Sequence, residues 1–124
     1  MSPTGKGATV SLKIASIVLD TPNAVQSANF WAAALNWQVS DWSHPGEAAV
    51  RNPNGGSGLY FMQVPEGKTI KNRLHLDLEP EGSTRGEIER LIGLGASEVR
   101  SFESHTVMQD PDGNEFCVTG DPKS

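Results

Sequence analysis

The sequence predicts an α+β fold in which a strand, a helix and three further strands follow one another and then repeat. Short segments rich in Val, Ile and Leu read as strands, two segments have helical spacing, and turn residues separate them. The halves match at a constant shift, because Ser16 corresponds to His75 (75 − 16 = 59) and Leu35-Asn36-Trp37 corresponds to Leu94-Gly95-Ala96. A plain α+β alternation without duplication is the alternative.

In the first half, residues 12–19 form an apolar strand. A helix follows, with Thr21 as its N-cap and Pro22 at its first position. Its apolar stripe consists of Val25, Ala28, Ala32 and Leu35. Asn36 can end this helix in the left-handed conformation. The remaining strands of this half are predicted over 37–42, 47–51 and 59–64, with a turn-rich stretch over 52–56.

In the second half, residues 73–78 alternate strictly between apolar and polar side chains, which predicts a strand. Ser83 or Thr84 caps the second helix, and Gly95 ends it. The apolar positions of this helix are Ile88, Leu91 and Ile92. The three remaining strands are predicted over 96–100, 106–109 and 115–119.

Length and composition restrict the class of protein. The 124 residues suit one domain, which we expect over 11–124 after a flexible tail at 1–10, with halves at 11–65 and 71–120. The net charge of −5 and the absence of a basic stripe argue against nucleic acid as a partner, and no apolar run is long enough for a membrane span. The single cysteine, Cys117, excludes an intramolecular disulfide, and we expect a cytoplasmic protein.

The predicted strand over 73–78 has two chemically different faces, because successive side chains point to opposite sides of a sheet. Its apolar face consists of Leu74, Leu76 and Leu78, which we expect to pack against the helices. Its open face then carries Arg73, His75 and Asp77. By the same alternation, Glu115 and Cys117 lie on the open face of the last strand.

The open face mixes apolar and polar side chains, which is typical of a ligand-binding wall. Its apolar members are predicted to be Ile14, Val18, Tyr60, Met62, Met108 and Cys117, with Ser16 on the same face of its strand as Val18. For Arg73 and Asp77, an exposed ion pair is the alternative to a ligand contact. His75 and Glu115 lie on corresponding strands, and a histidine with a carboxylate is a candidate catalytic acid–base or metal-binding pair.

The sequence resembles the vicinal oxygen chelate superfamily, and within it the small glyoxalase-like and bleomycin-resistance-like proteins. The segments that carry the resemblance are 17–20, 30–37, 71–78, 94–96 and 110–118. The most specific are Lys71-Asn72-Arg73-Leu74-His75-Leu76-Asp77-Leu78 and the segment from Asp110 to Val118. The resemblance implies two βαβββ modules that form a cupped mixed β-sheet with the helices on its outer face, and it implies a homodimer.

The resemblance also implies metal-ligand positions on the first and last strand of each module. Carried over to this sequence, these positions are Ser16, Tyr60, His75 and Glu115. Only His75 and Glu115 are of metal-ligand type, and a first-row metal usually needs three or four protein ligands. We therefore expect no cofactor, with a divalent metal (Zn, Ni, Mn or Fe) as the alternative.

Three functions are compatible with these residues. The first is a small-molecule-binding protein without a full metal site. Its predicted contact residues are Ser16, Trp42, Tyr60, Met62, Arg73, Asp77, Met108 and Cys117. The second is a metal-dependent lyase, isomerase or dioxygenase that acts on a vicinally oxygenated substrate, with Glu115 and His75 as catalytic residues and metal ligands. The third is a regulatory or interaction module.

Overall fold

The computed structural model describes residues 12–40 and 46–124. The first module contains β1 (Ser16–Thr21), α1 (Ala24–Leu35), β2 (Gln38–Val39), β3 (Glu47–Arg51) and β4 (Gly58–Gln63). The second contains β5 (Asp77–Leu78), α2 (Thr84–Leu94), β6 (Ser97–Ser101), β7 (His105–Gln109) and β8 (Glu115–Thr119). The predicted tail at 1–10 and the predicted contact residue Trp42 lie outside the described residues.

The two sheets have the same topology, with strand orders β1-β4-β3-β2 and β5-β8-β7-β6. In each module the first strand pairs in parallel with the last, and the other pairings are antiparallel. Asn36 and Gly95 end the two helices in the left-handed conformation at φ 58° and 118°. The predicted α+β fold of two βαβββ modules is therefore confirmed.

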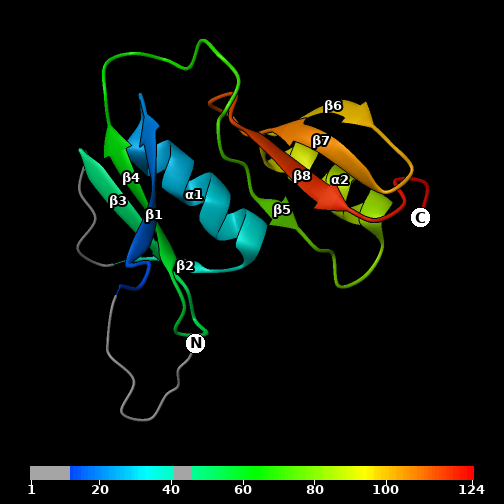
Figure 1. Cartoon of the computed structure of the whole chain (residues 1–124), viewed down its shortest axis with the longest axis horizontal. Helices are drawn as coiled ribbons and strands as arrows, with labels where there is room; N and C mark the ends of the chain where they lie inside the picture. Colours follow the sequence, from blue (N-terminus) through cyan, green and yellow to red (C-terminus); the bar gives the residue numbers. More distant parts are fainter. Residues whose placement is uncertain (1–11, 41–45) are drawn as a thin grey trace.

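Helix α1 lies between the two sheets (Figure 1) and joins the modules into one core. Its Trp31 is 1% exposed, and the Trp31 ring meets the Phe116 ring of β8 edge-on with a centroid distance of 5.1 Å. Phe30 contacts Trp31 in the same way at 5.3 Å. Large buried aromatic side chains contribute much of the stability of a small core, so the two modules depend on each other for burial.

The start of α1 differs from the prediction. The N-cap is Asn23, whose side chain accepts a hydrogen bond from the Gln26 backbone N–H at 3.1 Å. Thr21 is instead the buried last residue of β1, and its hydroxyl hydrogen-bonds Ser27 at 2.8 Å. Val25, predicted in the apolar stripe, is 44% exposed. Of the two caps predicted for α2, Ser83 and Thr84, the N-cap is Ser83, whose side chain accepts from the Gly86 N–H.

The predicted strand over 73–78 is shorter in the structure, where only Asp77–Leu78 pair with β8. Leu74 is 67% exposed and does not join the apolar face as predicted. Just before this segment, the Asn72 backbone N–H donates to the Glu115 side chain at 2.9 Å, so Asn72 forms no ladder hydrogen bond through this N–H.

The turn between β7 and β8 is organised by the buried carboxylate of Asp110. It accepts hydrogen bonds from the backbone N–H groups of Asp112 and Asn114 at 2.9 and 2.8 Å and from the Trp31 indole at 3.0 Å. Desolvation raises the pKa of Asp110, although the hydrogen bonds from Asn114 and Trp31 oppose the rise. Gly113 supplies the positive φ of 89° that the turn requires. The turn that precedes β8 is thus tied to α1 through Trp31.

Candidate functional site

A cavity of about 930 Å³ lies between β1 and the start of β8. Its walls come from β1, from segments 64–68 and 72–76, and from residues 112–116. The apolar part of its lining includes Ile14, Val18, Leu74, Trp31 and Phe116. The polar part includes Ser16, Lys68, Arg73, His75 and Glu115. An apolar wall with a few convergent polar groups suits a small organic ligand.

The carboxylate of Glu115 is held by two partners inside this cavity. Oε1 accepts from the Asn72 backbone N–H at 2.9 Å, and Oε2 forms a salt bridge with Lys68 Nζ at 3.1 Å. Desolvation alone would raise the pKa of Glu115, but the Asn72 and Lys68 interactions outweigh it, so the pKa lies below its ordinary value. The side chain is 15% exposed and carries a compensated negative charge.

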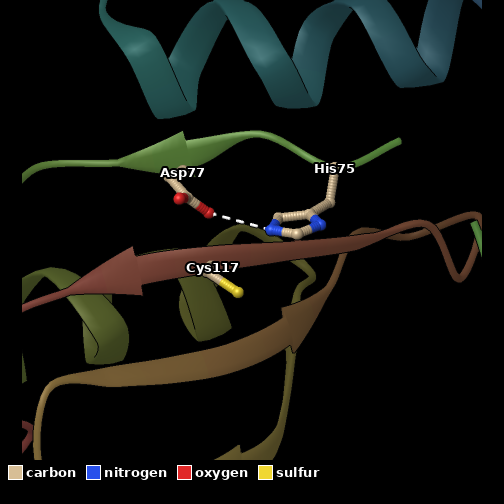
Figure 2. A group of neighbouring side chains, drawn as sticks. All are labelled: His75, Asp77 and Cys117. Atoms are coloured by element: carbon tan, nitrogen blue, oxygen red, sulfur yellow. Dashed lines mark ion pairs between the residues drawn. The ribbon is translucent and has the colours of Figure 1, made fainter. Parts of the chain in front are cut away.

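His75 and Asp77 point toward one another beside β8 (Figure 2), with His75 Nε2 and Asp77 Oδ1 3.1 Å apart. Both side chains are accessible, at 46% and 62% exposure. Cys117 projects from the adjacent strand, opposite Asp77 in the register. Burial and the Asp77 charge raise the pKa of the Cys117 thiol, although Lys71 opposes them. The isolated thiol is therefore protonated at neutral pH and a poor nucleophile.

The structure brings together six of the residues singled out from the sequence, since the cavity lining includes Ile14, Ser16, Val18, Arg73, His75 and Glu115. The remaining ones do not line it. Among the described residues, Asp77 and Cys117 flank His75 without lining the cavity. Tyr60 and Met62 lie on the face of β4 opposite the buried Leu59 and Phe61, also outside the cavity lining.

The prediction that Met108 lies on the open face is wrong. Met108 is 0% exposed and belongs to the core. In the antiparallel register of β7 and β8 it stands opposite Phe116, whereas Val107 stands opposite Cys117. Because directly opposed residues share a face, Met108 faces the helices and Val107 faces the same side as Cys117.

Lys68 and Asn72, which hold Glu115, were not predicted from the sequence. Both belong to the connection between the modules, where residues 64–76 contain no regular element. A periodic pattern cannot find such residues. The sequence does place a positively charged side chain and an amide shortly before His75, in the segment that connects the two modules.

The family model described as a glyoxalase-like domain matches residues 16–119. The chain therefore belongs to the glyoxalase-like family of the vicinal oxygen chelate superfamily. No curated protein has a significant match to it. Neither helix of the described residues has the length and apolar character to cross a bilayer.

Solved structures share the fold at low sequence identity. A possible glyoxalase from Bacillus cereus has a TM-score of 0.70 and 18% identity, covering 88% of this chain and 99% of that one. A glyoxalase/bleomycin resistance protein/dioxygenase family enzyme from Burkholderia phytofirmans PsJN has a TM-score of 0.70 and 16% identity, with coverage of 88% and 98%. The bleomycin-binding protein of Streptomyces verticillus, complexed with copper(II)-bleomycin, has a TM-score of 0.59 and 18% identity, with coverage of 90% and 98%.

The metal positions implied by the resemblance do not fit the residues of this chain. The two modules have equivalent registers, with Val18 opposite Tyr60 and Asp77 opposite Cys117. Tyr60 therefore corresponds to Cys117 and not, as predicted, to Glu115. The first-module equivalents of His75 and Glu115 are Ser16 and Gly58, which pair with each other and supply no imidazole or carboxylate.

Proposed function

We propose that this protein binds a small organic molecule in the cavity between β1 and β8, without a metal at the family's ligand positions. The observation that carries the proposal is the cavity itself, whose volume of about 930 Å³ lies within the range of small-molecule sites. The residues at these positions support the absence of a metal there, since the first-module counterparts of His75 and Glu115 are not of metal-ligand type. The metal-dependent lyase, isomerase or dioxygenase alternatives require a set of such ligands.

The ligand suited to this cavity has an apolar body and at least one polar group. Val18, Ile14 and Leu74 offer exposed apolar surface, and Arg73 and His75 offer hydrogen-bond donors. The Streptomyces verticillus protein binds copper(II)-bleomycin with the same fold. At 18% identity, that complex supports a binding role of this general kind and does not identify the ligand of this chain.

The proposal is tested by titrating a panel of drug-like and metabolite ligands and following tryptophan fluorescence, because Trp31 lies in the cavity wall. Two half-exposed apolar residues give a matched pair of variants. Val18→Glu introduces a charge into the cavity, whereas Met62→Glu introduces one on the open face of the neighbouring strand.

We expect Val18→Glu to weaken binding by about tenfold, or about 1.4 kcal/mol, because the ligand would have to cover a charged side chain in place of apolar surface. Met62→Glu should bind as the wild type does. A panel without any saturable signal would contradict the proposal. An equal loss of ligand binding in Met62→Glu would instead indicate that the ligand binds on the open face of the first sheet, with Met62 as one of its contacts.

We further propose that the chain forms a homodimer. The open face of the first sheet carries Val18 and Met62 at 50% and 41% exposure, on neighbouring strands. Exposed apolar residues grouped in this way favour a protein partner. Light scattering at several concentrations tests this proposal, and a monomer mass throughout would contradict it.

A further inference from the structure

Lys68 lines the ligand cavity from the irregular connection between β4 and β5. We propose that its ammonium group binds an oxyanion of the ligand, so that the cavity takes organic acids with an apolar body. This inference rests on the proposed function and adds the chemical class of the ligand to it. Lys68 belongs to neither module's first or last strand, where the resemblance places metal ligands.

The Lys68 ammonium is held in place by two acceptors. Its Nζ donates to Glu115 Oε2 at 3.1 Å and to the backbone carbonyl of Ile70. Glu115 is itself fixed through the Asn72 N–H, which donates to Oε1 at 2.9 Å. A free lysine side chain loses much rotamer freedom when it binds a ligand. Folding has already fixed this one, so Lys68 binds a ligand at a smaller entropic cost than a free surface lysine does.

One N–H of Lys68 remains for a ligand. An ammonium group has three donors, and Nζ has no acceptor among the described residues besides Glu115 and the Ile70 carbonyl. The side chain is 18% exposed and Lys68 lines the cavity, so a third acceptor can approach it there. An ionised acceptor forms the stronger hydrogen bond with an ammonium group. This donor therefore favours a carboxylate over an amide or an alcohol.

The ion pair with Glu115 reduces this attraction but does not reverse it. Both Glu115 oxygens already accept hydrogen bonds, whereas Lys68 keeps a donor. A ligand oxygen that accepts this N–H lies closer to the ammonium than to the carboxylate, so attraction exceeds repulsion. Arg73 adds a second cation to the lining, and its guanidinium has no ion pair with any described residue.

Three further carboxylates of the lining act on the ligand less directly. The Asp112 carboxylate accepts a hydrogen bond from the Ser27 hydroxyl. Asp20 and Glu66 are exposed, so water and salt screen their charges. The apolar part of the lining, which includes Val18 and Phe116, suits the body of the ligand. A hydrophobic carboxylate matches both parts of the cavity.

The test uses three probes that share a naphthalene body, namely 2-naphthoate, neutral 2-naphthamide and protonated 2-naphthylmethylamine. Isothermal titration calorimetry of the full chain near neutral pH measures their dissociation constants. We expect 2-naphthoate to bind about tenfold more tightly than 2-naphthamide, because a hydrogen bond to a charged group is stronger than one to a neutral group. The amine should bind most weakly, since it brings a positive charge to the ammonium.

Two variants break the Lys68–Glu115 ion pair in opposite ways. Lys68→Met removes the ammonium and keeps an apolar stem, so it should abolish the preference for 2-naphthoate over 2-naphthamide. Glu115→Gln removes the opposing negative charge and keeps the ammonium, so it should strengthen 2-naphthoate binding by about threefold. An ion pair with a purely structural role would instead weaken both probes in both variants, and that result would overturn the inference.

Lys71→Met is the matched control, because it removes the same charge from the same connection at an exposed residue that does not line the cavity. Its dissociation constants for the three probes should stay within about twofold of the wild type. Circular dichroism of each variant separates lost binding from lost folding.

The inference and the proposed function can fail separately. Equal binding of 2-naphthoate and 2-naphthamide to the wild type, or tightest binding of the amine, would overturn the inference and leave the proposed function intact. If none of the three probes binds saturably, the inference fails, and the wider ligand panel decides on the proposed function by itself.

Discussion

The Glu115 carboxylate is engaged at both oxygen atoms before any ligand arrives. The Asn72 N–H and the Lys68 ammonium occupy the positions that a metal or a substrate proton would otherwise take. A carboxylate whose pKa is lowered in this way is a weak general base. Glu115 therefore joins the module connection to β8, and His75 is the more accessible ionisable group of the predicted pair.

The first prediction concerns the pH dependence that Glu115 gives to stability. Its folded-state pKa lies below the ordinary value of 4.5, so its stabilising contribution is present above about pH 4.5 and is lost as the pH falls through the folded pKa. Glu115→Gln should lower the free energy of unfolding by about 1 kcal/mol at neutral pH, and by progressively less below pH 4.5. Urea denaturation at a series of pH values measures both quantities.

The exposed residue Glu103 provides the control, because Glu103→Gln changes the formal charge equally and Glu103 does not line the cavity. Its free energy of unfolding should follow the wild type at every pH. A Glu115→Gln difference that is constant from pH 3 to pH 7 would contradict the proposed role of the Lys68 and Asn72 contacts.

At the scale of elements, the features that depend on the local sequence could be predicted. The features that depend on contacts with distant strands or side chains could not. The ends of both helices follow from Asn36 and Gly95, which tolerate a left-handed backbone. The face on which Met108 lies depends instead on its register with β8, which no local pattern of its own strand encodes. Likewise, the side chain that accepts from the Asn72 N–H before β5 belongs to Glu115, 43 residues further along the chain.

The same reasoning applies to the candidate site. His75, Arg73, Ser16 and Glu115, which line the cavity, were singled out from the sequence, because alternation assigns a face to each residue of a strand. It could not align Tyr60 correctly, since the pairing of β1 with β4 fixes that correspondence. It also could not identify the connection residue Lys68 as a partner of Glu115, because that contact belongs to an irregular segment.

The second prediction uses the two equivalent helix ends as a matched pair. Gly95 has φ 118°, a conformation that a side chain disfavours, so Gly95→Ala should destabilise the protein by about 1 kcal/mol. Asn36 has φ 58°, so Asn36→Gly should be tolerated and change stability by only a few tenths of a kcal/mol. Thermal unfolding monitored by circular dichroism compares the two, and equal costs would contradict this account of the caps.

At the scale of the whole molecule, the repeat does not make two independent units. Trp31 of the first module contacts Phe116 of the second and donates to Asp110 at 3.0 Å. Arg90 of α2 donates in return to the carbonyl of Ala34 at 2.8 Å at the end of α1. Each module thus completes the burial of the other, and the ligand cavity lies along their junction.

The last prediction follows from this shared core. The chain should unfold in urea as one cooperative unit, with tryptophan fluorescence and far-ultraviolet circular dichroism giving the same midpoint. The fluorescence reports the first module, since Trp31, Trp37 and Trp42 are the chain's tryptophans, whereas circular dichroism reports both. Trp31→Ala should lower the free energy of unfolding by about 3–5 kcal/mol and shift both midpoints together.

A fragment of residues 11–65 should lack cooperative unfolding, because without Phe116 and Asp110 its Trp31 has lost both its ring contact and its hydrogen-bond acceptor in the second module. Separate midpoints for the two signals, or a cooperatively folded fragment, would show that the modules are independent and that the cavity between them depends on docking instead of on a common core.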